Sequence, residues 1–120
     1  MDRAAGLNSQ RPIFELKAEM FKAMAHPARI RILEVLSEGE HSVSGMQPLI
    51  DIELSHLSQQ LGVLRRAGLV VSRKEGNSVF YDMSDPELKQ LLAVAKRFLI
   101  NRLTESTGIL NDLRSANRQR

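Results

Sequence analysis

The sequence contains no cysteine. Disulfide bonds, thiolate metal ligands and cysteine nucleophiles all require a thiol, so each of them is excluded. The chain also lacks any apolar run near the roughly 18 residues that span a membrane. Its first residues, MDRAAGLNSQRP, include no apolar stretch of the signal-peptide type. We therefore expect a cytoplasmic protein with no membrane partner.

Motifs of enzyme active sites are missing as well. The three histidines stand apart, and no glycine-rich phosphate loop, paired-carboxylate motif or triad-like context accompanies them. We predict that the protein is not an enzyme. With 120 residues, 42% of them hydrophobic, and no internal repeat, the chain has the material for one domain. Its net charge of +3 suits a polyanionic partner without singling one out.

Proline, glycine and apolar spacing mark out the first three helices. Apolar residues three and four apart predict an amphipathic helix over residues 12–25 and a second helix over residues 27–39. A proline begins each of these two helices, at a position where the backbone N–H that proline lacks would have no partner within the helix. A short third helix follows, for which Ser42 and Ser44 are alternative N-caps.

The stretch SHLSQQLGVLRRAGLV predicts a fourth helix, with Ser55 as its N-cap and Gly68 at its end. Leucines at helical spacing place one face in the core, and polar side chains point elsewhere. The core set is Leu57, Leu61 and Leu64, and the outward set is His56, Gln59, Gln60, Val63 and Arg66.

The remaining third of the chain predicts a hairpin and a long helix. The segment LVVSRKEGNSVFYDM alternates like two strands around Gly76-Asn77, a pair that favours a tight turn. Pro86 then opens a helix whose apolar stripe reaches Leu103, followed by an extra turn around residues 109–113. We divide the chain into a flexible arm (1–12), one domain (13–113) and a flexible tail (114–120).

This order of elements is that of a winged helix-turn-helix, mainly α with a small β-hairpin. A helix that enters the major groove needs apolar residues behind it and short hydrogen-bonding side chains at its N-terminal end. Between Ser55 and Lys74 there are four basic residues and no acidic ones, so this segment forms a phosphate-binding stripe. The base-reading set is Ser55, His56, Ser58 and Gln59, and the basic set is Arg65, Arg66, Arg73 and Lys74. A solvated surface helix with an ordinary hairpin is the alternative interpretation.

Three motifs carry a resemblance to a known family: AHPARIRIL in the second helix, SHLSQQLGVLRRAGLV in the fourth, and RKEGNSVFY in the hairpin. Over residues 14–103 the chain resembles the ArsR/SmtB family of dimeric bacterial repressors. The resemblance implies a sequence-specific transcriptional regulator, a repressor that binds an inverted-repeat DNA operator as a homodimer. It places Gly76 and Asn77 at the tip of a DNA-contacting wing and makes His26 a structural histidine.

A two-fold dimer also follows from the apolar faces of the first and last helices, which exceed what a small core can cover. The dimer would place its recognition helices in successive major grooves about 34 Å apart. We expect the interface to contain Phe14, Ala18, Phe21, Leu88, Leu92, Ala95, Phe98 and Leu99. The alternative is a last helix that folds back on its own domain.

The signal to which such a regulator responds is less defined. The family's metal sites use cysteines, or carboxylates and histidines of the last helices. The resemblance keeps Asp85 as a ligand, but Glu87 stands where a histidine is usual, and Phe98 and Asn101 stand where the partner helix should supply ligands, so we expect the common zinc site to be absent. A divalent metal such as nickel or zinc remains a candidate cofactor, held by nitrogen and oxygen only. The candidate ligands are Glu38, Glu40 and His41, or a mixed set using Glu15, Glu19 or Asp82.

Two further alternatives concern partners. A regulatory partner protein, rather than a metal, is one way to supply the sensing function. The alternative to an operator-binding regulator is a winged helix that serves as a protein–protein interaction module without operator specificity. A protein-binding surface more often shows exposed apolar residues, whereas the edge predicted here is polar.

Overall fold

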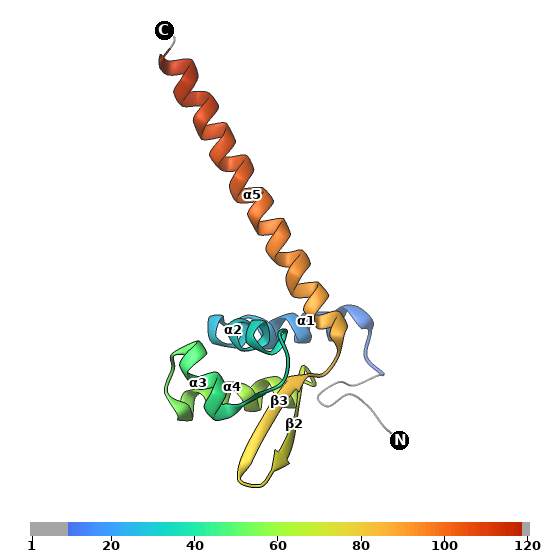
Figure 1. Cartoon of the computed structure of the whole chain (residues 1–120). Helices are drawn as coiled ribbons and strands as arrows, with labels where there is room; N and C mark the ends of the chain where they lie inside the picture. Colours follow the sequence, from blue (N-terminus) through green and yellow to red (C-terminus); the bar gives the residue numbers. More distant parts are fainter. Residues whose placement is uncertain (1–9, 119–120) are drawn as a thin grey trace. The chain divides into compact units, whose positions relative to one another are not determined.

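The computed structural model describes residues 10–118. The chain divides into two units, residues 1–89 and 90–120, and each is described by itself. The elements are α1 (Ile13–Met24), α2 (Pro27–Leu36), β1 (His41–Ser42), α3 (Val43–Ile50), α4 (Leu54–Arg66), β2 (Val70–Glu75), β3 (Ser78–Met83) and α5 (Pro86–Arg118), and Figure 1 labels the helices and the two longer strands. The predicted class, mainly helical with a small hairpin, is confirmed.

Three helices build the core of the first unit. α2, α3 and α4 contribute side chains with almost no exposed surface: Ile32, Leu33, Leu36, Met46, Leu57, Leu61 and Leu64. The predicted core leucines of α4 are all among them, because spacings of three and four residues place them on one face of a helix. The core therefore holds α4 by this face and leaves other positions of the helix open to solvent.

The junction between α1 and α2 is set by His26 and Pro27. Pro27 is the first residue of α2, and His26 is the N-cap. The Nδ1 atom of His26 accepts a hydrogen bond from the backbone N–H of Ala28 at 3.0 Å. Across the junction, the Arg29 side chain donates a hydrogen bond to the carbonyl of Ala23 at 3.0 Å. His26 thus has a structural place at the helix junction.

The expected N-terminal arm lies largely outside the described residues, which begin at residue 10. Within the described part, the Arg11 side chain donates hydrogen bonds to the carboxylates of Glu15 and Glu19 on α1. Both carboxylates were candidates for a mixed metal site. Their pairing with a guanidinium gives them a different role, since it joins the chain before α1 to the helix itself.

α4 begins earlier than the sequence predicted. Its N-cap is Glu53, which makes no side-chain capping bond, so the prediction of Ser55 as the N-cap was wrong. The turn from α3 passes through Asp51 in the left-handed region (φ 60°) and leads directly into a helix that starts at Leu54. The end of α4 agrees with the prediction, because Gly68 follows it with φ 78°, a conformation that glycine adopts without strain.

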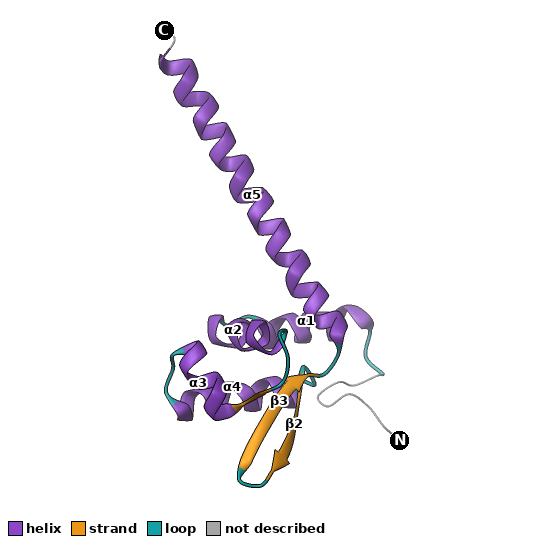
Figure 2. Ribbon diagram, in the orientation of Figure 1, coloured by secondary structure: helices purple, strands orange, loops and turns teal. Residues whose placement is uncertain are grey.

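The sheet has three antiparallel strands in the order β1-β3-β2. β2 and β3 form the predicted hairpin, and Figure 2 shows it, in orange, extending beyond the helices of the first unit. Glu75 pairs with Ser78 across a two-residue turn, in which Gly76 has φ 62°. We call this hairpin, Val70–Met83, the wing. The sequence did not predict β1, because two residues are too few to show strand alternation.

α5 is one continuous helix of 33 residues, and its residues from Gln90 onward form the second unit. The sequence predicted that the tail would begin at residue 114, whereas the helix continues to Arg118. Residues 119–120 lie outside the described part. No helix of the described residues combines the length and apolar character required to cross a membrane.

Candidate nucleic-acid interface

Three short polar side chains form an exposed edge at the start of α4. Ser55, Ser58 and Gln59 are all exposed. Spacings of three and four residues bring them to the same side of the helix, within its first two turns. A helix N-terminus also carries a partial positive charge. The edge therefore offers hydroxyl and amide groups together with an electrostatic preference for anions.

His56 and Gln60 lie on another face of α4. The ring of His56 meets that of His26 edge to face, with 6.1 Å between the ring centroids, and His56 is only half exposed. Gln60 is 8% exposed, so the prediction that it points away from the core was wrong. It follows His56 by four residues, so the two side chains lie on the same face of α4. His56 therefore packs against the helix junction.

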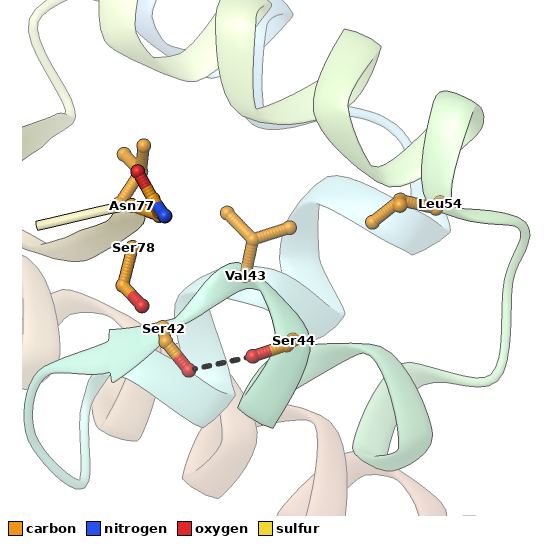
Figure 3. Close-up of a pocket in the computed structure, with 7 residues that line it drawn as sticks. Ser42, Val43, Ser44, Leu54, Asn77 and Ser78 are labelled. Carbon is orange, nitrogen blue, oxygen red and sulfur yellow. Dashed lines mark hydrogen bonds between the residues drawn. The ribbon is translucent and has the colours of Figure 1, made fainter.

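A hollow of about 230 Å³ separates the starts of α3 and α4 from the tip of the wing. It is lined by Ser42, Val43, Ser44, Leu54, Asn77, Ser78 and Val79. Figure 3 shows Val43 between Asn77 and Leu54, and the hydroxyl oxygens of Ser42 and Ser44 are 3.3 Å apart. Ser42 is the N-cap of α3, since its hydroxyl accepts a hydrogen bond from the N–H of Gly45 at 3.0 Å. The hollow thus combines hydroxyl and amide groups with apolar side chains.

The basic residues of the predicted stripe differ in their surroundings. Arg65, Arg66 and Lys74 are exposed, and none forms an ion pair with another residue of the described part. The Arg66 guanidinium lies back along the helix, beside Gly62. A methyl group added to Gly62 would come within 3.1 Å of the Nη1 atom of Arg66. Asn77 is exposed at the tip of the wing. These four side chains are open to a ligand.

Arg73, in contrast, is held between two carboxylates. Its Nε and Nη2 donate hydrogen bonds of 2.7 Å to the two oxygens of Glu40, and Nη1 donates one of 3.1 Å to Glu75. The Arg73 hydrogen bond lowers the pKa of Glu40 below its ordinary value, and the two carboxylates raise the pKa of Arg73. Sequence reasoning missed this cluster, because Glu40 is 33 residues from Arg73.

The candidate metal ligands do not converge. Among residues 10–118 no group of three or more histidine and acidic side chains is placed to hold a metal ion. The Nδ1 atom of His41 lies 2.7 Å from the carbonyl oxygen of Gly39, and Glu40 is paired with Arg73. Glu38 is exposed on the same loop. The loop is therefore organised by contacts within the protein, and a metal site on it gains no support.

Most residues of the predicted dimer interface are accessible. On α1, Phe14, Ala18 and Phe21 are exposed, and on the second unit Ala95, Phe98 and Leu99 are exposed. Leu92 is half-buried. Leu88 differs, since it is 7% exposed and belongs to the core of the first unit. Its spacing matched the stripe of α5, but it lies in the first turn of the helix, where the helix joins the first unit.

Comparison with known proteins agrees with this geometry. A family model described as a helix-turn-helix domain matches residues 24–73. Rv0081, an HTH-type transcriptional regulator of Mycobacterium tuberculosis, is 50% identical over 105 residues, which cover 87% of this chain and 92% of that protein. The crystal structure of Rv0081 has a TM-score of 0.74 at 49% identity, covering 81% of this chain and 98% of that one.

Two other proteins are similar. The biofilm growth-associated repressor of Agrobacterium fabrum is 41% identical over 75 residues, which cover 62% of this chain and 64% of that protein. Mb0332 of Mycobacterium bovis is described as a possible ArsR-family regulator with a homodimeric winged helix-turn-helix DNA-binding domain. Its solution structure has a TM-score of 0.73 at 25% identity, covering 86% of this chain and 95% of that one.

The helical core, the polar edge of α4 and the wing together define a winged helix-turn-helix protein of the DNA-binding class. The chain belongs to the ArsR family of winged helix-turn-helix transcriptional regulators. This family is non-enzymatic, and the expectation that the protein is not an enzyme is thereby confirmed.

Proposed function

We propose that the protein is a homodimeric repressor that recognises an inverted-repeat DNA operator. The observation that carries the proposal is the polar edge of α4, where Ser55, Ser58 and Gln59 are exposed while the helix is anchored by three buried leucines, Leu57, Leu61 and Leu64. A recognition helix needs this division, since its rear face must dock on the domain and its front must reach base edges.

Roles within the edge follow from side-chain chemistry. Gln59 carries both a donor and an acceptor, so it can bind adenine through two hydrogen bonds, whereas the serine hydroxyls are less selective. We assign base reading to Ser55, Ser58 and Gln59. His56 stands beside this set in the sequence, but its ring packs against His26. We therefore give His56 the role of holding α4 in place.

The DNA backbone is assigned to the cations and the wing. Arg65, Arg66 and Lys74 are exposed and can neutralise phosphates, and Asn77 can donate a hydrogen bond from the tip of the wing. The hollow beside the wing adds the hydroxyls of Ser44 and Ser78. Such contacts fix the position of the protein on the duplex and do not depend on base sequence.

Dimerisation is supported by the apolar side chains that each unit exposes by itself. α1 exposes Phe14 and Phe21, and the second unit exposes Phe98, Leu99 and Leu103 among others. A lone amphipathic helix gains little stability in water, so the stripe on α5 needs a partner surface. A second copy supplies one by two-fold symmetry, as in the homodimeric Mb0332 domain. Repression is proposed by analogy with the relative that is named a repressor.

The division of roles predicts different losses for two substitutions. Gln59→Ala should weaken binding to the operator by about 1–3 kcal/mol and leave binding to scrambled DNA nearly unchanged. Lys74→Ala should weaken both alike and reduce the slope of log affinity against log salt by about one. Fluorescence anisotropy with both DNAs at several salt concentrations measures these quantities.

Lys89→Ala is the matched control for Lys74→Ala, since Lys89 is an exposed lysine outside the proposed interface. It should leave the salt slope as in the wild type. Equal losses of Gln59→Ala on operator and scrambled DNA would refute the base-reading role. Weak binding of the wild type without operator preference would instead favour a winged helix used for protein contacts.

A further inference from the structure

The contacts of Arg73 form one connected cluster on a single face of the sheet. In the register of the sheet, Arg73 on β2 is opposite Phe80 on β3, and Phe80 is opposite Ser42 on β1. The guanidinium carbon of Arg73 lies 4.6 Å from the centroid of the Phe80 ring. Glu40 comes just before β1. The Arg73 side chain therefore extends from β2 across β3, over Phe80, and reaches Glu40 beside β1.

The hydrogen bonds of the cluster occupy the guanidinium on two sides. Glu40 accepts from Nε and Nη2, each at 2.7 Å, which is the bidentate arrangement that a carboxylate makes with arginine. Glu75 accepts from Nη1 at 3.1 Å. Two carboxylates and one guanidinium carry a net charge of −1. The charge of Arg73, on the wing that we expect to contact DNA, is therefore neutralised by neighbouring carboxylates.

The bidentate edge of an arginine fits a phosphate as well as a carboxylate, because both present two oxygens in similar geometry. We propose that the Glu40 carboxylate occupies the position of a DNA backbone phosphate at Arg73, and that a phosphodiester displaces it when the protein binds DNA. This inference rests on the proposed function, in which the wing meets the DNA backbone.

Displacement is feasible because the ion pair is exposed. The side chains of Arg73 and Glu40 retain 51% and 34% of their surface accessible, so water and salt screen their attraction. A phosphate on DNA belongs to a dense row of negative charges and competes well for a cation. Glu40 is therefore an internal competitor that lowers the affinity of the protein for any DNA, through its contact with Arg73.

The test compares Glu40→Gln with Glu38→Gln, both in the wild type and in an Arg73→Ala background. Glu38 is a matched control, because it is exposed on the same loop and forms no ion pair among residues 10–118. Affinity is measured on scrambled and operator DNA across a salt series. Glu40→Gln should bind both DNAs roughly two- to fivefold more tightly than the wild type, which is the range of an exposed ion pair.

The salt series distinguishes exchange at Arg73 from a general loss of negative charge. Glu40→Gln should steepen the salt slope by about one, because Arg73 then starts with a counterion to release. Glu38→Gln should change affinity much less, and in the Arg73→Ala background the two glutamine variants should be alike. The melting temperature of Glu40→Gln should match that of the wild type, since the pair is exposed.

Weaker binding of Glu40→Gln, or an effect no larger than that of Glu38→Gln, would overturn the inference. The failure of the proposed function has a separate signature. A wild type that binds DNA without operator preference would refute operator recognition, while the comparison on scrambled DNA would still decide the role of Glu40. A wild type that binds no DNA at all would refute both.

Discussion

Leu99→Glu should convert the protein from a dimer to a monomer of 13.5 kDa. Leu99 is 58% exposed on α5 and lies on its apolar stripe. In a two-fold dimer the substitution introduces two carboxylates into an apolar interface, where they lose hydration and find no partner. Light scattering measures the mass directly. Operator affinity should fall by roughly 100-fold or more, because two half-sites no longer bind as one linked unit.

Thr104→Glu is the control for this substitution. It adds the same charge to the same helix, but Thr104 is five residues further along, about 140° around the helix axis from Leu99, and off the apolar stripe. It should remain dimeric and bind the operator as the wild type does. A dimer that survives Leu99→Glu would place the interface elsewhere, whereas dissociation by both substitutions would mean that charge anywhere on α5 is disruptive.

Leu61→Ala should lower the free energy of unfolding by about 2–5 kcal/mol. Leu61 has no exposed surface and lies on the face of α4 that packs into the core. The truncation removes apolar contacts and leaves a cavity that the neighbouring side chains fill only in part. This is a large share of the total stability of a small domain, which is about 5–15 kcal/mol. Urea unfolding at one fixed protein concentration measures the change.

Gln59→Ala serves as the control on the same helix. Gln59 is exposed, so its truncation should change the free energy of unfolding by less than about 0.5 kcal/mol. The two substitutions therefore test the two faces of α4 separately. Leu61→Ala tests the buried face through stability, and Gln59→Ala tests the exposed edge through operator affinity. A loss below about 1 kcal/mol for Leu61→Ala would show that α4 is not anchored by this face.

The local features of the fold could be predicted from the sequence. Pro27 and Pro86 each begin a helix, and Gly76 supplies the positive φ of the hairpin turn. Leu57, Leu61 and Leu64 of α4 lie in the core as their spacing predicts. In each case the cause is a property of one residue or of residues within two turns, such as a fixed φ, a permitted left-handed conformation or a shared helix face.

Features that depend on distant residues could not be predicted. β1 exists because His41 and Ser42 pair with β3, about 40 residues later, and their own sequence shows no strand pattern. The Glu40–Arg73 pair forms only once β1 and β2 flank β3. The segment from Ser55 to Lys74 contains no acidic residue, and the sheet then placed the distant carboxylate of Glu40 on one of its arginines.

The burial of polar side chains on α4 was also decided by packing. Gln60 looks like an outward residue beside Gln59, yet one step along a helix turns a side chain by about 100°. That step places Gln60 on a buried face of the helix, with His56 one turn earlier. The sequence therefore indicated that α4 has a polar edge, and only the packing showed which polar residues belong to it.

The most direct test of operator recognition is selection of a random double-stranded DNA library on the wild-type protein, followed by sequencing of the bound pool. Recognition by a two-fold dimer should enrich two related half-sites in inverted orientation, with centres about 10 base pairs or a whole multiple apart. A bound pool with no shared sequence, retained only at low salt, would contradict operator recognition. It would mean that the protein binds DNA only through electrostatic attraction to the phosphates.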